Sequence, residues 1–294
     1  VNGTKVGENH YGYNDFAFDI SKYLTCDGTT ENVISVKVVH QTRSSRWYSG
    51  SGIYRDVELI VTDAVHVSRN GTYVTTPNLA TEKDGDVTVK VQTDVQNDSS
   101  AQAAAQIRTT VLDAEGKAVS KAVTTDVTLA ANSTAEKEQT LKVNKPALWS
   151  TENPNLYYVQ TEVLVDGKVK DTYRTTYGFR YINFDANTGF SLNGKNVKLK
   201  GVCMHHDQGA LGAASERDAV YRQVKKLKEM GCNAIRTSHN TPSSVLLEAC
   251  NELGMMVMDE TFDGWAFPKN GNSQDFSTHF NQTISADNKL LGAT

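Results

Sequence analysis

Cysteine, net charge and long apolar runs are all scarce in this chain of 294 residues. The four cysteines, Cys26, Cys203, Cys232 and Cys250, form no Cys-x-x-Cys pair, which argues against a zinc ribbon. The last three lie in apolar patterns and are predicted to be small buried residues rather than disulfides or reactive thiols. A net charge of −4 offers no basic surface for nucleic acid. No apolar run approaches the roughly 20 residues that cross a bilayer, so membrane insertion is not expected.

The amino-terminal residues are patterned as β-structure. Residues 1–63 contain an Asn-Gly turn signal and short runs of apolar residues, notably at 33–39 and 56–61, that are typical of strands. They predict the carboxyl-terminal part of a β-sandwich, a partial jelly roll. Four short strands are too few to close such a sandwich, so we expect its first part to be missing from this chain.

Residues 64–182 contain a second and more regular β-pattern. Apolar residues alternate with polar ones at 87–95, 107–113 and 157–165, and Asp-Gly and Glu-Gly turn signals separate such runs. About seven strands over this length predict an immunoglobulin-like β-sandwich.

Residues 183–294 change to strands that alternate with helices. Strands are predicted at 197–202, 233–236 and 255–260, and a stripe of apolar residues at helical spacing fills each interval. Successive strand–helix units of this kind build a (β/α)₈ barrel. Three units cannot close one, so the sequence predicts the amino-terminal part of a TIM barrel that is truncated at its carboxyl end.

Particular residues mark where the two predicted helices begin and end. Ser215 and Asp218 have the spacing of a capping box, which predicts the start of the first helix. Pro242 is predicted to occupy the first position of the second helix. Gly231 and Gly254 are placed to end the two helices.

Polar and ionisable side chains follow the first two predicted barrel strands. Residues 201–207 read GVCMHHD and residues 233–239 read NAIRTSH. The carboxyl ends of parallel barrel strands form one rim, so His205, Arg236 and His239 are expected to lie together there. The ordinary alternative is a hydrogen-bonded structural role for each histidine and a structural salt bridge for the arginine.

Four motifs occur along the chain: SGIYRDV at 51–57, LWSTENPNLY at 148–157, YGFR at 177–180 and NAIRTSH at 233–239. In sequence and order they resemble those of glycoside hydrolase family 2, and the resemblance extends over nearly the whole chain. The resemblance implies a sugar-binding sandwich domain, an immunoglobulin-like middle domain and a TIM barrel that hydrolyses β-glycosides.

Within that family, two segments are most similar to β-galactosidases. They are residues 201–207 and residues 259–265, which read DETFDGW. The resemblance therefore implies hydrolysis of terminal β-D-galactosides. A β-glucuronidase or β-mannosidase of the same family, or a non-catalytic carbohydrate-binding module, remains the alternative. The family includes cytoplasmic, secreted and wall-attached members, so the compartment is left open.

The resemblance also implies roles for single residues. Retaining glycosidases use two carboxylates about 5 Å apart, and family members place both glutamates on later barrel strands. No segment here matches the acid/base signature, so the chain is predicted to hold no catalytic residue and to be inactive alone. His205 and His239 would donate hydrogen bonds to sugar hydroxyls, and Arg236 would face the nucleophile's position. Asp263 and Trp265 would contact the sugar with a carboxylate and a ring.

Metal binding is implied only weakly. Asp56 matches a residue that binds sodium in some relatives, and its alternative is an arginine partner within its loop. Some relatives bind magnesium through a Glu-x-His motif after the third strand, but residues 262–265 read FDGW here. His205, His206 and Asp207 are adjacent, a spacing that does not suit a transition metal. The sequence therefore assigns no cofactor, and sodium or magnesium in the whole enzyme is the alternative left open.

An aromatic and basic loop precedes the second sandwich. Its residues Arg43, Arg46, Trp47 and Tyr48 are predicted to form a cation–π cluster that supports the barrel rim. The expected partner of the whole protein is a carbohydrate substrate, and the sequence leaves oligomerisation open.

Overall fold

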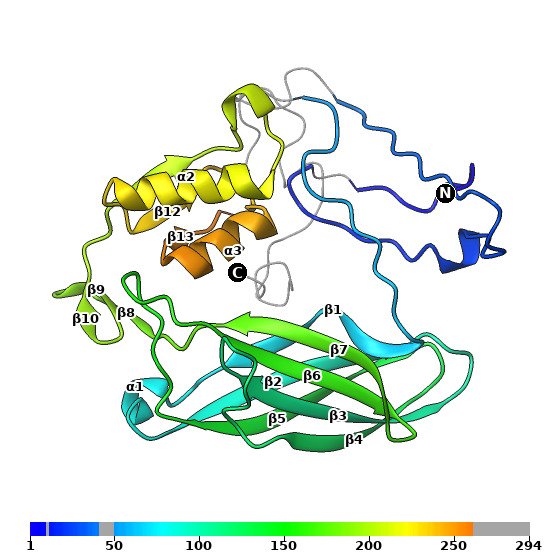
Figure 1. The fold of residues 1–294 in the computed structure, drawn as a ribbon, viewed down its shortest axis with the longest axis horizontal. Helices are drawn as coiled ribbons and strands as arrows, with labels where there is room; N and C mark the ends of the chain where they lie inside the picture. The colour runs from blue at the N-terminus through cyan, green and yellow to red at the C-terminus, as the bar shows by residue number, and fades with distance from the viewer. Residues whose placement is uncertain (10–11, 41–49, 261–294) are drawn as a thin grey trace.

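The computed structural model of the protein describes residues 1–9, 12–40 and 50–260, which form three successive regions (Figure 1). An extended amino-terminal region is followed by a β-sandwich and then by a smaller unit of parallel strands and helices. Within the described ranges, no helix is both long and apolar enough to cross a membrane.

The amino-terminal region begins with the predicted tight turn. Asn2 and Gly3 have φ angles of 50° and 79°, and the amide of Thr4 donates to the carbonyl of Val1 at 2.8 Å. The runs predicted as strands at 33–39 and 56–61 are not formed as paired strands. In the described part of residues 1–63 the only regular element is a 3₁₀ helix, η1 (Ser21–Tyr23). Apolar side chains along these runs are largely exposed, because a strand is buried only when a ladder partner and a facing sheet cover it.

The predicted immunoglobulin-like sandwich is confirmed. Two antiparallel sheets with the orders β1-β2-β5 and β4-β3-β6-β7 pack face to face. A short helix, α1 (Leu79–Glu82), follows the first strand. The strands are β1 (Val65–Thr75), β2 (Asp86–Asn97), β3 (Ala103–Leu112), β4 (Val123–Leu129), β5 (Ser133–Asn144), β6 (Tyr157–Val165) and β7 (Lys168–Tyr177).

Alternation along each strand produces the sandwich core. In β2 every second residue is buried, and Val87, Val89 and Val91 are fully enclosed between the sheets. The hairpin from β6 to β7 turns at Asp166 and Gly167, whose φ angles of 50° and 71° suit the two central positions of a tight turn.

One polar side chain, Gln139, lies within this apolar core. Its Oε1 accepts from the Thr109 hydroxyl at 2.6 Å, and its Nε2 lies within hydrogen-bond distance of Ile107 O, Val123 O and the Thr125 hydroxyl. Gln139 is on β5 and the other four residues are on β3 and β4, so the amide joins the two sheets. A buried amide is tolerated when its hydrogen bonds are satisfied, as these are.

A small hairpin sheet connects the sandwich to the third region. It contains β8 (Ile182–Asp185), β9 (Gly189–Leu192) and β10 (Lys195–Asn196). An Asn-Gly turn lies between the last two strands, with φ angles of 54° at Asn193 and 76° at Gly194.

The third region is the start of a TIM barrel, as predicted. Three strands form a parallel sheet in the order β11-β12-β13, and helices α2 and α3 cover one face of it (Figure 1). A 3₁₀ turn, η2 (Gly209–Leu211), precedes the first helix. The elements are β11 (Gly201–Met204), α2 (Arg217–Glu229), β12 (Ala234–Thr237), α3 (Ser244–Leu253) and β13 (Met256–Met258).

Helices α2 and α3 end at the glycines predicted to end them, but they do not begin at the predicted residues. Gly231 and Gly254 follow the two helices with φ angles of 95° and 71°. The capping box expected at Ser215 is wrong, because Glu216 is the N-cap and the Ser215 amide instead donates to Tyr54 O at 2.7 Å. Pro242 lies before the helix rather than in its first turn, since the hydroxyl of Ser243 caps α3 by accepting from the Leu246 amide.

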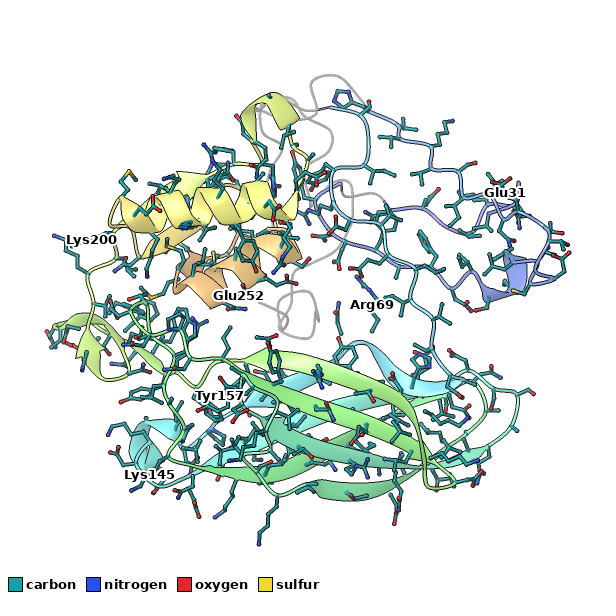
Figure 2. The ribbon with its side chains drawn as sticks, in the orientation of Figure 1. Glu31, Arg69, Lys145, Tyr157, Lys200 and Glu252 are labelled. Carbon is teal, nitrogen blue, oxygen red and sulfur yellow. The ribbon has the colours of Figure 1, made fainter. Side chains whose placement is uncertain are left out.

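The end of the sandwich packs directly against the barrel unit. The buried indole of Trp149 donates to Asn251 O in α3 at 2.8 Å, and the Lys228 ammonium at the end of α2 donates to the carbonyls of Thr151 and Gly254. On the other side, Arg69 projects from the sandwich toward the amino-terminal region and pairs with Asp15 (Figure 2).

Candidate active site

The carboxyl ends of the parallel strands carry the ionisable side chains that the sequence pattern singles out. In β12, Ile235 is fully buried against the helices, so Arg236 extends from the opposite face of the sheet. Cys203 lies opposite Arg236 in the register between β11 and β12. Both residues therefore lie on the face that becomes the interior of a barrel.

Arg236, His239 and Glu260 form one hydrogen-bonded cluster. The Arg236 Nε and Nη2 groups contact Oε1 of Glu260, and Nδ1 of His239 lies 2.6 Å from Oε2 of the same carboxylate. Side chains of His239 and Glu260 are only 19% and 21% exposed. Because water is partly excluded, these charge-assisted contacts are stronger than equivalent surface pairs.

His205 completes this group of side chains. Its ring meets the His239 ring edge to face, with the centroids 5.6 Å apart and the planes 88° apart. The structure thus brings together all three rim residues, His205, Arg236 and His239, that the strand-end pattern predicts.

The backbone beneath the cluster is held by Thr237. Its hydroxyl accepts from the Glu260 amide at 2.9 Å and donates to Asp259 at 3.4 Å, while its own side chain is buried. Burial raises the pKa of the Asp259 carboxyl above its usual value. Asp259 accepts from the Thr237 hydroxyl, whereas the Glu260 carboxylate contacts Arg236 and His239.

Cys203 differs from the other barrel cysteines. It was predicted to be buried, but its thiol is exposed and lies 3.6 Å from Nη1 of Arg236. The Ser238 hydroxyl and the Arg236 guanidinium lower the pKa of this thiol. Cys250 is buried as predicted, and burial raises the pKa of its thiol to about 12.

His206 turns away from the cluster and packs against the amino-terminal region. Its ring stacks on Tyr13 at 5.5 Å and meets Tyr54 edge to face at 5.7 Å. Burial, with the nearby charges of Arg55 and His205, lowers the pKa of His206 to about 4. The ring is therefore neutral at pH 7 and acts as a packing surface.

The same amino-terminal region is clasped to the loop after β12. Arg55 donates to Thr241 O at 2.5 Å and to Tyr13 O at 2.8 Å, and the Thr241 hydroxyl donates to Asn14 at 2.9 Å. The Arg55 guanidinium also lies 5.0 Å above the ring of Tyr54. Residues that are far apart in the sequence thus support one side of the rim.

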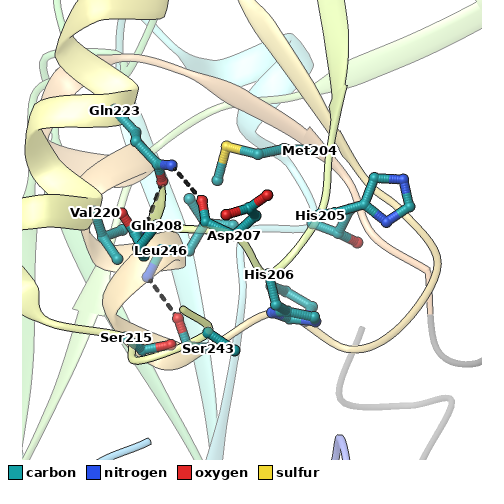
Figure 3. A pocket seen from close by; sticks show the side chains of 13 residues that line it. Met204, His205, His206, Asp207, Gln208, Ser215, Val220, Gln223, Ser243 and Leu246 are labelled. Carbon is teal, nitrogen blue, oxygen red and sulfur yellow. Dashed lines mark hydrogen bonds between the residues drawn. The ribbon is translucent and has the colours of Figure 1, made fainter. Parts of the chain in front are cut away.

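A small cavity lies at the ends of β11 and β12, and its lining includes His205 but not Arg236, His239 or Glu260 (Figure 3). Gln223 crosses it, donating to Asp207 O at 2.8 Å and accepting from Gln208 at 2.9 Å. The imidazole of His205 points away from these two glutamines (Figure 3). With a volume of about 30 Å³ the cavity has room for a water molecule, not for a sugar ring.

Several predicted site residues are not placed by the structure. Asp263 and Trp265, with the loop residues Arg43, Arg46, Trp47 and Tyr48, lie outside the described residues. Asp56 is exposed, and among residues 1–9, 12–40 and 50–260 no group of three His, Cys, Asp or Glu side chains is arranged to hold a metal ion. The sodium site at Asp56 therefore stays a prediction.

Sequence reasoning missed the carboxylate that joins the cluster. Glu260 was not among the predicted site residues. Its position at the end of the third strand was the available signal, because that strand ends at the same rim as the other two. Tyr13 and Asn14 were missed as well, since nothing in residues 1–63 indicates contact with a loop near residue 241.

Two family models match this chain. The model described as glycosyl hydrolases family 2 matches residues 65–180, and the model of the TIM barrel domain of glycosyl hydrolases family 2 matches residues 186–292. The beta-galactosidase BoGH2A of Bacteroides ovatus is 39% identical over 98% of this chain and 33% of its own length.

Solved structures of glycosyl hydrolase family 2 members are also similar to this chain. A glycosyl hydrolase family 2 member from Bacteroides cellulosilyticus is 42% identical, with a TM-score of 0.73 over 78% of this chain and 31% of its own. A beta-glucuronidase of Bacteroides uniformis is 29% identical, with a TM-score of 0.65 over 72% of this chain and 26% of its own. The chain spans about a third of the length of the relatives it matches.

Proposed function

Since the chain belongs to glycosyl hydrolase family 2, we propose that it supplies one side of the sugar-binding site of a retaining exo-β-glycosidase. The observation that carries this proposal is the cluster of His205, Arg236 and His239 at the carboxyl-end rim of β11 and β12. Active sites of TIM-barrel enzymes lie at this rim. Imidazole and guanidinium groups offer the hydrogen bonds that sugar hydroxyls accept and donate.

Each side chain has a stated task in this proposal. His205 and His239 bind hydroxyl groups of the sugar, and contacts of this kind strengthen in the transition state of glycoside hydrolysis. Arg236 provides a fixed positive charge beside the position of the nucleophilic carboxylate and favours its ionised form. Asp263 and Trp265 add further contacts to the sugar. The two catalytic glutamates come from barrel strands beyond the three described here.

The substrate we propose is a terminal β-D-galactoside. The 39% identity to a relative named beta-galactosidase supports this choice. A β-glucuronide is the second candidate, because a relative named putative beta-glucuronidase is also 39% identical, over 90% of this chain. A galactoside and a glucuronide differ at C6, where only the glucuronide carries a carboxylate.

The test compares the two nitrophenyl glycosides on the protein that carries this chain. We expect kcat/KM for the β-galactoside to exceed that for the β-glucuronide by at least tenfold. His239→Asn and Arg236→Gln should each lower kcat/KM for the better substrate by about 10- to 100-fold, the range for loss of hydrogen bonds to charged groups. A higher kcat/KM on the glucuronide would overturn the galactoside assignment, and unaffected variants would overturn the site.

The isolated chain provides a separate check. Purified as these 294 residues, it should not release nitrophenol from either glycoside, because both carboxylates required for double displacement are absent from the rim described here. Any turnover that exceeds the rate of a His239→Asn control would contradict this expectation.

A further inference from the structure

One carboxylate, that of Glu260, contacts both Arg236 and His239 at the rim. Glu260 uses Oε1 for the Arg236 guanidinium and Oε2 for Nδ1 of His239, the second contact at 2.6 Å. The Nη1 group of Arg236 faces Cys203 instead. The two oxygens of Glu260 therefore fix two neighbouring side chains at once.

Glu260 is itself held from its backbone. The buried Thr237 hydroxyl accepts from the Glu260 amide at 2.9 Å. Thr237 directly follows Arg236 on β12, so the same strand anchors both the carboxylate and its cationic partner. A group held at backbone and side chain can orient others without much loss of conformational entropy.

The carboxylate also determines which nitrogen of His239 carries a hydrogen. An ionised carboxylate only accepts hydrogen bonds, so Nδ1 must be the donor in this contact. In a neutral imidazole the other nitrogen, Nε2, then holds a lone pair. A neutral His239 consequently presents an acceptor through Nε2, whereas the family resemblance implied a donor.

We propose that Glu260 is a positioning residue that orients Arg236 and His239 and sets His239 in the Nδ1–H tautomer, so that Nε2 accepts a hydrogen bond from a sugar hydroxyl. This inference rests on the proposed sugar-binding function. Glu260 acts through its two partners and does not itself contact the sugar.

The tautomer can be measured on the chain as it exists. Long-range ¹⁵N–¹H correlation spectra of the labelled 294-residue chain separate the two tautomers of each histidine, and a His239→Asn variant assigns the signal. In the unaltered chain the neutral form of His239 should be mainly the Nδ1–H tautomer. Predominance of the Nε2–H form would overturn the proposal without any further variant at Glu260.

The variant Glu260→Gln tests directly whether this carboxylate sets the tautomer of His239. The Arg236 guanidinium can only donate, so it should take the amide oxygen of the new side chain and turn the amide NH₂ toward His239. Nδ1 must then accept, and the tautomer of His239 should invert to Nε2–H. The matched control is Glu248→Gln, which removes one charge from the exposed face of α3, where Glu248 pairs with Arg217 at 2.8 Å. An unchanged tautomer in a folded Glu260→Gln variant would overturn the proposal.

Kinetic measurements on the protein that carries this chain separate the positioning role of Glu260 from the sugar-binding role of the rim. Glu260→Gln should lower kcat/KM for the preferred glycoside by about 10- to 100-fold, the range for loss of a carboxylate that orients a metal-binding histidine. Glu248→Gln should stay within about twofold. If the tautomer inverts while kcat/KM is unchanged, the positioning by Glu260 stands and the sugar-binding role of this rim fails.

Discussion

At the scale of single residues, neighbouring histidines on one loop have different chemistry because their surroundings differ. His205 faces the cluster and touches His239, whereas the next residue, His206, is enclosed by Tyr13 and Tyr54. The environment of each ring, rather than its place in the HHD motif, decides whether it can bind a polar ligand or only pack.

The surroundings of His206 predict a pH-dependent stability. Its pKa is about 4 in the folded protein and near 6.5 when unfolded, so between these values the unfolded chain binds the extra proton. Stability should therefore fall as the pH decreases from about 6.5 toward 4, by at most about 3 kcal/mol from this residue. His206→Phe keeps an aromatic ring between the tyrosines, so its stability should not show this decrease with pH. Urea midpoints at pH 5 and pH 7.5 measure it, and equal pH slopes in both proteins would contradict the prediction.

Strand-end positions predicted the rim residues but not the bonds among them. His205, Arg236 and His239 each follow an apolar run, which is enough to place them at one edge of a parallel sheet. The contact of Glu260 with Arg236 and His239 depends on the distance between neighbouring strands and on the path of the chain after β13. Neither quantity is encoded in a local pattern of residues.

At the scale of secondary-structure elements, the ends of the helices were predictable and the starts were not. Glycine ends a helix for a local reason, its low cost at positive φ, which holds at Gly231 and Gly254. At the start of α2 Glu216 is the N-cap, and the Ser215 amide bonds instead to a residue of the amino-terminal region. A contact between distant segments thus overrides a local capping signal.

The N-cap of α3 offers a direct test of local helix energetics. Ser243→Ala removes the hydroxyl that accepts from the Leu246 amide and should lower the free energy of unfolding by about 1 kcal/mol. Ser244→Ala is the matched control, because Ser244 is the exposed first residue of the same helix. Guanidinium unfolding followed by circular dichroism measures both. Equal effects at the two serines would show that the cap does not contribute.

The buried amide of Gln139 makes a second prediction at this scale. Gln139→Leu leaves the Thr109 hydroxyl and its other partners without the amide, which should cost about 1–3 kcal/mol or more of stability. Gln106→Leu serves as the control, since that amide bonds to Asp126 on the exposed face of β3 and should change stability by less than about 0.5 kcal/mol. A Gln139→Leu protein as stable as this control would mean that the core tolerates the loss.

At the scale of the whole molecule, the sandwich and the barrel unit share a tightly packed junction. Trp149 and Thr151 of the sandwich end meet the last turns of α2 and α3 through hydrogen bonds to Asn251 and Lys228. The burial of these groups indicates that the two regions stabilise each other. The two sheets of the sandwich were predictable from alternation, but this junction was not, because it depends on how two folded units meet.

A pair of glycine substitutions isolates the junction. Gly254 and Gly231 both have positive φ angles, so alanine at either position is strained by about 1 kcal/mol. A Cβ at Gly254 would also press directly against the carbonyl of Thr151, whereas one at Gly231 meets nothing within 4 Å. Gly254→Ala should therefore lower the thermal midpoint clearly more than Gly231→Ala. Equal shifts in differential scanning calorimetry would mean that the junction moves apart at little cost.

The clasp between Arg55 and Thr241 has a consequence for synthesis of the protein. The two residues are 186 positions apart, and Asn14 precedes Thr241 by 227. At about 5–20 residues per second, a ribosome that has made Arg55 needs roughly 10–40 s to reach Thr241. Throughout that interval the first segment lacks its later partner, so this side of the rim cannot form before Thr241 has been made.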